Sequence, residues 1–309
     1  MLDVKRLRIL REVAEHGSFS AAAESLYLSQ SAVSQQVATL EREVGMALLD
    51  RTREGATLTE AGRVLVEHAN AAIARLDEAE RDLAALAGLE GGEVRIASFP
   101  SASATILTSA VSDFVSHYPK VRVTVAEEEP EDSLPRLRSG QLDIALTFDY
   151  PEVPAAEERD LDHSLLLTET MHLALPPTHP LADRARVPLS ELDDEPWLSG
   201  NCASSCAEVV IASCRLAGFE PNIAYESDDY HVLQGFVAAG LGVTLLPDLA
   251  LPTLRSDVVV RPIDPSPPQR RVWAATRKAR SAGTQAMLDV LVDVGDRFAR
   301  QHAAVAAAA

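Results

Sequence analysis

The first sixty residues repeat apolar side chains at the 3.6-residue period of short helices. The pattern predicts one helix that ends at residues 16–18, a second over residues 19–26, and a third over residues 30–44. Ser29 can cap the third helix and Gly45 can end it. Two short helices joined by a tight turn are typical of helix-turn-helix proteins.

The third predicted helix has an apolar face and a polar face. Its apolar residues fall within about 60° of one another on a helical wheel and predict a buried stripe of Val33, Val37, Leu40 and Val44. The opposite face carries Ser31, Gln35, Ala38 and Arg42, with Ser34 on its flank. Small polar side chains let a helix enter the major groove, and Gln can pair with adenine through two hydrogen bonds. A solvated helix face would show the same polarity, so this helix alone leaves both interpretations open.

Residues 46–58 predict two short strands around a turn at Glu54-Gly55. Such a wing could place Arg51 and Arg53 against the DNA backbone, and Thr59 can cap the long helix that follows. The residues predicted to bind DNA are Ser29, Gln30, Ser31, Ser34, Gln35, Arg42, Arg51 and Arg53.

Five segments of residues 19–62 resemble, in order and spacing, the N-terminal signature of the LysR family of bacterial transcriptional regulators. They are Phe19-Ser20-Ala21-Ala22-Ala23-Glu24, Leu28-Ser29-Gln30-Ser31-Ala32-Val33-Ser34-Gln35-Gln36-Val37, Leu40-Glu41, Leu48-Leu49-Asp50-Arg51 and Leu58-Thr59-Glu60-Ala61-Gly62. The departures are Ser31, where many members have proline, Gln35, where arginine is frequent, and Leu49, where phenylalanine is usual. The resemblance implies a winged helix-turn-helix protein that binds DNA as a dimer, and the first two departures bear on which operator it prefers.

Residues 60–87 predict one long helix with a narrow, alanine-rich heptad seam. The seam steps alternately by four and three residues through Leu65, Ala69, Ala72, Leu76, Ala79, Leu83 and Leu86. A helix packed on its own domain is the alternative, but the resemblance implies the linker helix that pairs two subunits. Gly88, Gly91 and Gly92 then supply a flexible joint.

From Glu93 onward, strands and helices alternate, which predicts parallel α/β structure. Gly140-x-Leu142-Asp143, His179-Pro180-Leu181 and Gly240-Leu241-Gly242 resemble phrases of the LysR effector domain, a two-lobed periplasmic-binding-protein-like fold. The expected fold class is therefore α/β with an N-terminal winged helix-turn-helix domain built mainly of helices. The expected boundaries are 1–58 for the DNA-binding domain, 59–88 for the linker helix and 89–309 for the effector domain, with lobe I at about 93–164 and 269–302 and lobe II at about 165–268.

Ligands of open parallel sheets bind beyond the carboxyl ends of the strands, where helix N-termini offer free amides. Residues 98–103, 147–148 and 199–204 meet this description. The resemblance implies that they line the effector cleft. Their side chains could also serve only to cap helices. The predicted effector-binding residues are Ser98, Phe99, Ser101, Ser103, Thr147, Phe148, Asn201, Cys202 and Ser204.

Other residues of the chain suggest other chemistries. Cys202, Cys206 and Cys214 suggest a redox switch, but cysteines at helical spacing commonly pack as small apolar residues. The acidic run at residues 127–132 could hold a hard cation, although a solvated surface with acidic first-turn residues is the simpler interpretation. The sequence shows no nucleophile elbow, phosphate-binding loop, HExxH or CxxC motif. We therefore expect no enzyme activity, cofactor or metal. The rival function classes are a solute-binding protein and an α/β enzyme that uses the interlobe cleft.

Charge and composition refine this picture. The formal charge is −18, but residues 1–66 carry eight basic and nine acidic side chains, so the acidity lies in the other 243 residues. A nearly neutral first domain predicts modest non-specific affinity for DNA. The chain has no apolar run of about 18 residues, and Lys5 and Arg6 stand where a signal peptide needs its apolar core.

These features predict a cytoplasmic protein that does not enter a membrane. Its expected partners are double-stranded DNA with an inverted-repeat operator, a small-molecule effector and further copies of itself as a homodimer and homotetramer, with RNA polymerase as a possible contact.

Overall fold

The computed structural model describes residues 2–51, 55–86, 92–151, 153, 160–201 and 205–308. The chain divides into two compact units, one made of Met1–Ala87 with Arg138–Gln141 and a second made of Gly88–Leu137 and Leu142–Ala309. After the roles expected for them, the first is called the DNA-binding unit and the second the effector unit, and each is described by itself.

Three capped helices begin the DNA-binding unit: α1 (Val4–His16), α2 (Phe19–Ser25) and α3 (Gln30–Val44). The side chains of Asp3, Ser18 and Ser29 accept backbone N–H groups at the three N-termini. Gly17 and Gly45 end α1 and α3 with φ of 60° and 77°, a left-handed conformation that glycine adopts without a steric penalty. The predicted helices, and both ends of the third, are confirmed.

The apolar stripe of α3 is the centre of this unit's core. Val33, Val37 and Leu40 are fully buried, and they belong to one cluster with Leu10 and Val13 of α1. Polar contacts hold the other edge of the same interface: the Arg6 guanidinium of α1 donates to Gln36 of α3 and pairs with Glu43 of α3. α3 is therefore fixed along its buried side, and its opposite side remains exposed.

Strands β1 (Leu49–Arg51) and β2 (Ala56–Leu58) form the predicted wing, whose tip at residues 52–54 lies outside the described residues. The Thr59 hydroxyl accepts the Gly62 N–H at 3.0 Å and donates to the Ala47 carbonyl at 2.8 Å. A side chain at Gly62 would collide with the Leu48 carbonyl oxygen. The Leu-Thr-Glu-Ala-Gly segment thus forms a capped helix start that packs closely against residues 47–48, just before β1.

Helix α4 (Glu60–Leu86) shows two different environments along the predicted seam. Near its start, Ala69 and Ile73 are buried in the core of the DNA-binding unit. Further along, Ala72, Leu76 and Ala79 are exposed. Ala69 and Ile73 therefore pack on the helix's own domain, while Ala72, Leu76 and Ala79 of the described seam are exposed. Leu83 and Leu86 lie among residues whose side chains are outside the description.

The main sheet of the effector unit follows the order β10 (Thr244–Pro247), β6 (Leu161–Leu175), β13, β5, β3 and β4. Its first half comprises β3 (Gly92–Ser98), β4 (Val121–Glu127), β5 (Ile144–Asp149) and β13 (Gln269–Arg277). β3 pairs in parallel with both β4 and β5, and β13 runs antiparallel to β5. This is the α/β arrangement that the alternating pattern predicted.

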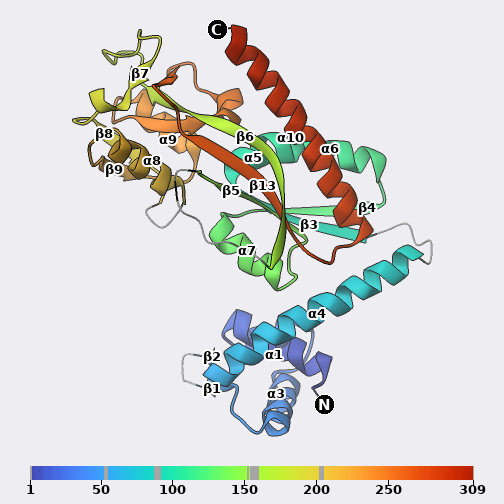
Figure 1. Ribbon diagram of the computed structural model, residues 1–309. Helices are drawn as coiled ribbons and strands as arrows, with labels where there is room; N and C mark the ends of the chain where they lie inside the picture. The colour runs from blue at the N-terminus through green and yellow to red at the C-terminus, as the bar shows by residue number, and fades with distance from the viewer. Residues whose placement is uncertain are drawn as a thin grey trace. The chain divides into compact units, whose positions relative to one another are not determined.

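Strand β6 (Leu161–Leu175) passes without a break from one half of the sheet to the other. It pairs with β13 as far as Thr170, and from Met171 it pairs with β10 (Thr244–Pro247), while β11 (Val259–Arg261) pairs with its end. β6 and β13 therefore form the connection between the two lobes, side by side through the centre of the unit (Figure 1).

The remaining elements cover the sheet and complete lobe II. The helical stretch between β3 and β4 is three consecutive segments, α5 (Pro100–Ala102), a π-helical turn η1 (Ser103–Leu107) and α6 (Thr108–His117). The other helical elements are α7 (Pro130–Arg138), η2 (Leu189–Glu191), α8 (Ser205–Leu216), α9 (Tyr230–Ala238), η3 (Asp248–Thr253) and α10 (Ala282–Ala308). The other strands are β7 (Val187–Pro188), β8 (Pro196–Ser199), β9 (Asn222–Glu226) and β12 (Ile263–Asp264).

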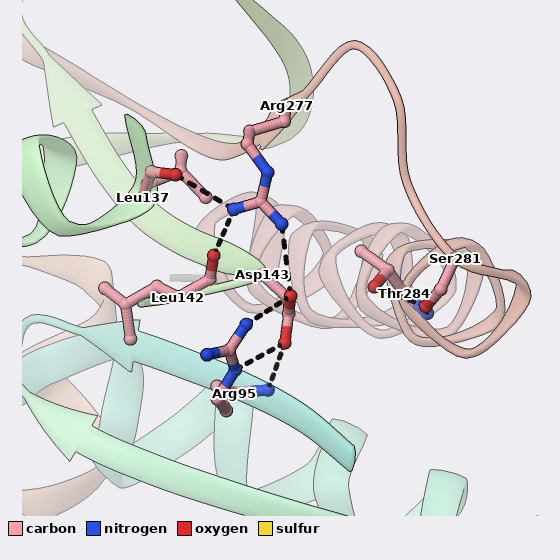
Figure 2. A network of polar contacts seen from close by, with 7 residues as sticks. All are labelled: Arg95, Leu137, Leu142, Asp143, Arg277, Ser281 and Thr284. Atoms are coloured by element: carbon pink, nitrogen blue, oxygen red, sulfur yellow. Dashed lines mark hydrogen bonds and ion pairs between the residues drawn. The ribbon is translucent and has the colours of Figure 1, made fainter. Parts of the chain in front are cut away.

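A buried carboxylate ties lobe I together at the amino end of β5 (Figure 2). Asp143 is 3% exposed and accepts the Arg95 backbone N–H and two guanidinium hydrogen bonds from Arg95, all at 3.0 Å. Arg277 of β13 adds a contact of 3.3 Å and also donates to the Leu137 and Leu142 carbonyls. The aspartate of the Gly140-x-Leu142-Asp143 phrase therefore joins β3, β5 and β13, and its role is structural.

Among the described residues, no helix combines the length and the apolar character that crossing a bilayer requires.

Candidate DNA-binding surface and effector cleft

The exposed face of α3 carries the polar residues predicted to read DNA. Gln30, Ser31 and Gln35 are exposed and Ser34 is half-buried. Ser29 holds the start of the helix, because its Oγ accepts the Ala32 N–H at 3.2 Å and lies 3.0 Å from the Ser31 Oγ. The structure thus gathers the neutral hydrogen-bonding side chains on the first two turns of a capped helix, the part that helix-turn-helix proteins insert into the major groove.

The cationic end of this surface lies further along α3. The Arg42 side chain is exposed, and its guanidinium donates to the Thr39 hydroxyl at 2.8 Å and to the Ala38 carbonyl at 3.4 Å. Its head is therefore held on the polar side of the helix. Arg51 ends β1 with a side chain outside the description, and Arg53 lies wholly outside it, so the predicted wing contacts have no described geometry.

In the effector unit, the predicted hydroxyls of lobe I lie at the carboxyl ends of β3 and β5. Ser98, Ser101 and Thr147 are each less than a tenth exposed. The Ser98 Oγ donates to the Phe99 carbonyl at 3.3 Å, and the Ser103 Oγ donates to the Ser98 carbonyl at the same distance. These residues are brought together as expected, and two of the hydroxyls contact the backbone of their own turn.

A buried arginine, which the sequence interpretation did not single out, occupies the centre of this region. Arg270 of β13 is fully buried, and its Nε donates to the Glu169 carboxylate of β6 at 2.7 Å. Its Nη2 donates to the Ser101 Oγ at 2.9 Å, and Glu169 also accepts the Leu249 N–H at 2.7 Å. The predicted effector residue Ser101 is therefore already bonded to the protein's own guanidinium.

Two aromatic rings pack beside this guanidinium. Phe99 and Phe148 meet edge to face with centroids 4.8 Å apart, and the Arg270 Cζ lies 5.1 Å and 5.2 Å from their centroids. Such cation–π contacts stabilise a desolvated arginine. Phe99 and Phe148, which were predicted to contact the effector, thus stabilise the buried Arg270 guanidinium.

Two acidic side chains, one from each lobe, interact electrostatically. Glu129 follows β4 in lobe I, and Asp228 follows β9 in lobe II. Burial raises the pKa of Glu129 to about 7, with repulsion from Asp228 as the next cause, while Arg270 acts in the opposite direction. Asp228 accepts the Asn201 N–H at 2.8 Å and the Asn201 Nδ2 at 3.1 Å. The charge of Asp228 therefore adds to the effect of burial on Glu129.

A small cavity lies beside Asp228 in lobe II. Its volume is about 10 Å³, and its lining includes Ser199, Asp228, Thr244, Met171 and Leu233. Ser199 is 2% exposed, and its Oγ has no hydrogen-bond partner among the described residues. The predicted residues Cys202 and Ser204 lie outside the description.

A second hollow, of about 650 Å³, lies between α6 and α10 and includes the ion pair of Asp113 with Arg297. It is open and away from the carboxyl ends of the strands. The buried polar groups converge instead at the carboxyl ends of β3 and β5, around Arg270 and Ser101.

The structure also bears on the cysteines. Cys214 is fully buried, and burial raises the pKa of its thiol to about 12. A thiol held neutral in this way reacts slowly with oxidants, because the thiolate is the nucleophile. Cys202 and the Cys206 side chain lie outside the description. Cys214 therefore behaves as a small core residue.

The interpretation of residues 127–132 as a solvated acidic surface is wrong for Glu129, which is half-buried and whose Oε2 has no hydrogen-bond partner in the described part of the chain. The rule that selected Ser98 could have found it, because Glu129 follows β4 at the same carboxyl edge of the sheet. Among the described residues, no group of three acidic, histidine or cysteine side chains is placed to hold a metal ion.

The two units and their sites define a class: a winged helix-turn-helix joined to a two-lobed α/β sensor domain. Residues 4–63 match the model of the bacterial regulatory helix-turn-helix proteins of the LysR family, and residues 87–296 match the LysR substrate binding domain. The chain belongs to the LysR family of DNA-binding transcriptional regulators.

Individual relatives agree with this assignment. The chain is 31% identical over 297 residues to the uncharacterized HTH-type transcriptional regulator YfeR of Shigella flexneri, covering 95% of this chain and 94% of the relative. It is 30% identical over 273 residues to a hydrogen peroxide-inducible genes activator of Dickeya chrysanthemi, covering 88% of each. It is similar in fold to full-length CbnR in complex with its target DNA, with a TM-score of 0.67, 22% identity, and coverage of 96% of this chain and 100% of that one.

Proposed function

We propose that the protein binds an inverted-repeat operator as a homodimer and that a small molecule in the interlobe cleft of the effector unit controls this binding. One observation carries the proposal: α3 is capped and buried along one side, and presents an uncharged polar face on its first turns. Under this proposal the cleft senses a ligand and catalyses no reaction, and the protein acts in the cytoplasm.

Base recognition is assigned to the exposed side chains at the start of α3. Gln35 can hydrogen-bond adenine through both polar atoms of its amide, and Ser31 and Ser34 are short enough to allow a close approach to the base edges. Arg42 and the wing arginines contact phosphates, which fix the position of the helix without reading sequence. The proposed set is Ser29, Gln30, Ser31, Ser34, Gln35, Arg42, Arg51 and Arg53.

Dimerisation is assigned to the far half of α4. Ala72, Leu76 and Ala79 are exposed there at heptad spacing, and small residues allow two helices to approach closely. Two recognition helices related by a twofold axis then contact half-sites about one helical turn apart. Association of dimers into a tetramer, and contact with RNA polymerase, would carry the effector signal to transcription.

The effector is assigned to the cleft between the carboxyl ends of the lobe I strands and the corresponding edge of lobe II. The residues proposed to surround it are Ser98, Phe99, Ser101, Ser103, Thr147, Phe148, Asn201, Cys202 and Ser204. Because Ser101 already accepts a hydrogen bond from Arg270, an effector that contacts Ser101 must share that hydroxyl or displace the guanidinium.

The DNA assignment is tested by fluorescence anisotropy with DNA from just upstream of the gene, at several salt concentrations. Each phosphate contact contributes about 0.9 to the slope of log affinity against log salt. We expect Arg42→Ala to weaken binding and to lower the slope by about one contact. Arg122→Ala is the matched control, because it removes an exposed arginine from the effector unit. Equal slopes for both variants and the parent would overturn the role of Arg42.

A further inference from the structure

The turn between α2 and α3 holds one residue in a left-handed backbone conformation. The Leu28 N–H donates to the Ala23 carbonyl at 2.9 Å, and the Tyr27 N–H donates to the Glu24 carbonyl at 3.1 Å. These two bonds form the Schellman pattern that ends many helices, and its left-handed position usually holds glycine. Here that position is Tyr27, with φ of 54°, the one positive φ outside glycine among the described residues.

Contacts within the chain do not account for a tyrosine at this position. Any side chain is unfavourable in the left-handed conformation, because its Cβ crowds the backbone. Tyr27 is 96% exposed, so burial does not offset this cost. Tyr118 differs, because it is 45% exposed and its ring packs on Phe114 with centroids 4.9 Å apart. A strained residue that keeps its side chain in solvent points to a role for that side chain outside the folded unit.

Tyr27 is continuous with the proposed DNA-binding surface. Residues 27–31 are exposed without interruption, from Tyr27 through the capping residue Ser29 to Gln30 and Ser31 on the first turn of α3. Two residues of chain span at most about 7 Å, and the major groove is about 12 Å wide. When the start of α3 lies in the groove, Tyr27 can therefore reach the sugar-phosphate backbone at the edge of the groove.

The chemistry of the phenol suits that position. Tyrosine hydroxyls are among the groups that donate hydrogen bonds to phosphate oxygens. A tyrosine ring also offers a large contact area at a small entropic cost, because few side-chain torsions have to be fixed. Neutral donors matter in this domain, since residues 1–66 carry eight basic and nine acidic side chains. A domain without excess positive charge needs such groups to hold the DNA backbone.

We infer that Tyr27 contacts the sugar-phosphate backbone of the operator, with its ring against a deoxyribose and its hydroxyl donating a hydrogen bond to a phosphate oxygen. The inference rests on the proposed DNA-binding function and adds to it a residue outside the exposed face of α3 and the wing. The contact made on DNA offsets the conformational cost of tyrosine at a position where the fold alone favours glycine.

Fluorescence anisotropy tests this contact with the parent, Tyr27→Gly and Tyr27→Phe, on DNA from just upstream of the gene and on unrelated DNA. Glycine keeps the left-handed conformation and removes the side chain. We expect Tyr27→Gly to bind both DNAs about tenfold more weakly, or about 1.4 kcal/mol, since phosphate contacts carry no sequence information. Tyr27→Phe, which lacks only the hydroxyl, should bind about fivefold more weakly. Tyr118→Phe is the matched control, because it removes the hydroxyl of an exposed tyrosine from the effector unit.

Two readouts separate a DNA contact from a structural role of Tyr27. The slope of log affinity against log salt should stay that of the parent in Tyr27→Gly, because no positive charge is lost. Amide exchange in the DNA-binding unit should be no faster in Tyr27→Gly than in the parent, because glycine adopts the left-handed conformation without a steric penalty. A side chain needed for folding would instead give faster exchange.

Nitration by tetranitromethane, read by peptide mass spectrometry, tests the contact in the unsubstituted chain. We expect the upstream DNA to slow nitration of Tyr27 and to leave the rate at Tyr118 unchanged. This measurement and Tyr27→Phe still decide the question if Tyr27→Gly does not fold.

Parent-like binding by both Tyr27 variants, a loss of affinity confined to the upstream DNA, or nitration of Tyr27 that DNA does not slow would each overturn the inference. The parent in the same anisotropy assay separates this failure from that of the proposed function. A parent that binds the upstream DNA no better than the two variants do refutes only the Tyr27 contact, whereas a parent that binds no DNA refutes the proposed function as well.

Discussion

Neighbouring arginines on β13 allow a sharp test of the buried charge pair in the effector unit. Arg270 faces Glu169, and both side chains are at most 1% exposed. Arg271 pairs with Asp149 through two hydrogen bonds of 2.7 Å and 2.8 Å, but these side chains are 39% and 25% exposed. The same substitution by methionine at the two positions therefore removes a similar ion pair from a dry and from a wet environment.

The expected costs differ severalfold. Removing one partner of a buried pair leaves an uncompensated charge and costs about 3–5 kcal/mol, so Arg270→Met should destabilise the effector unit by that amount. Exposed pairs contribute about 0–1 kcal/mol, which is the expected cost of Arg271→Met. Replacing both buried partners, in Arg270→Met with Glu169→Leu, removes the unpaired charge and should restore most of the lost stability.

The pH dependence identifies the cause. Burial raises the pKa of Glu169, and the nearby Arg270 charge opposes that rise. Without the arginine the folded-state pKa rises further, so the carboxylate is protonated at a higher pH. A raised folded-state pKa means that stability is lost as pH increases. The penalty of Arg270→Met should therefore be largest at alkaline pH and shrink as the pH falls.

Urea denaturation followed by tryptophan fluorescence measures these effects in the right unit, because Trp197 and Trp273 are the two tryptophans of the chain and both lie in the effector unit. The buried-pair argument fails if Arg270→Met and Arg271→Met cost the same. It also fails if the cost of Arg270→Met does not change with pH.

Three further predictions concern other described residues. Glu129→Gln should stabilise the effector unit by on the order of 2–3 kcal/mol at pH 8 but not near pH 4. The pKa of Glu129 is about 7 in the folded chain, so its charge destabilises the fold as the pH rises above the ordinary pKa of a carboxyl group. Urea midpoints that shift equally at both pH values would contradict this. Gly62→Ala should lower the helix content and amide protection of the DNA-binding unit, because the new methyl group collides with the Leu48 carbonyl. Gly235→Ala is the control and should be harmless, because Gly235 has open space around it. A Gly62→Ala protein with native helix content and protection would refute the close contact. Cys214 should resist iodoacetamide at pH 7.5 until the chain unfolds, as read by peptide mass spectrometry, and modification of native protein would show that the thiol is reachable and ionised.

Local patterns predicted the DNA-binding unit well, because its helices obey short-range rules. The bounds of α3 follow from a capping serine, a 3.6-residue apolar stripe and a terminal glycine, all within sixteen residues of one another. The own-domain packing of the start of α4 was harder to predict. A heptad seam looks the same in the sequence whether a second subunit or the same domain covers it. Ile73 lies off the predicted seam, and its burial shows that this part of α4 packs on its own domain.

The centre of the effector cleft could not be predicted in the same way, because its contacts join distant parts of the chain. Arg270 meets Glu169 across 101 residues and Ser101 across 169. A single charged residue in a strand is usually exposed, so composition and periodicity gave no sign of the buried pair. The hydroxyls at the strand ends were predictable from the α/β rule, but the arginine bonded to one of them was not.

The most direct test of the account is a DNase I footprint of the purified protein across the DNA upstream of its gene, with Gln35→Ala run beside the parent. The account predicts a protected stretch with twofold sequence symmetry, lost or redistributed in the variant while its circular dichroism stays native. A promoter left uniformly cleaved, or protection that lacks symmetry and is unchanged by Gln35→Ala, would contradict recognition through α3.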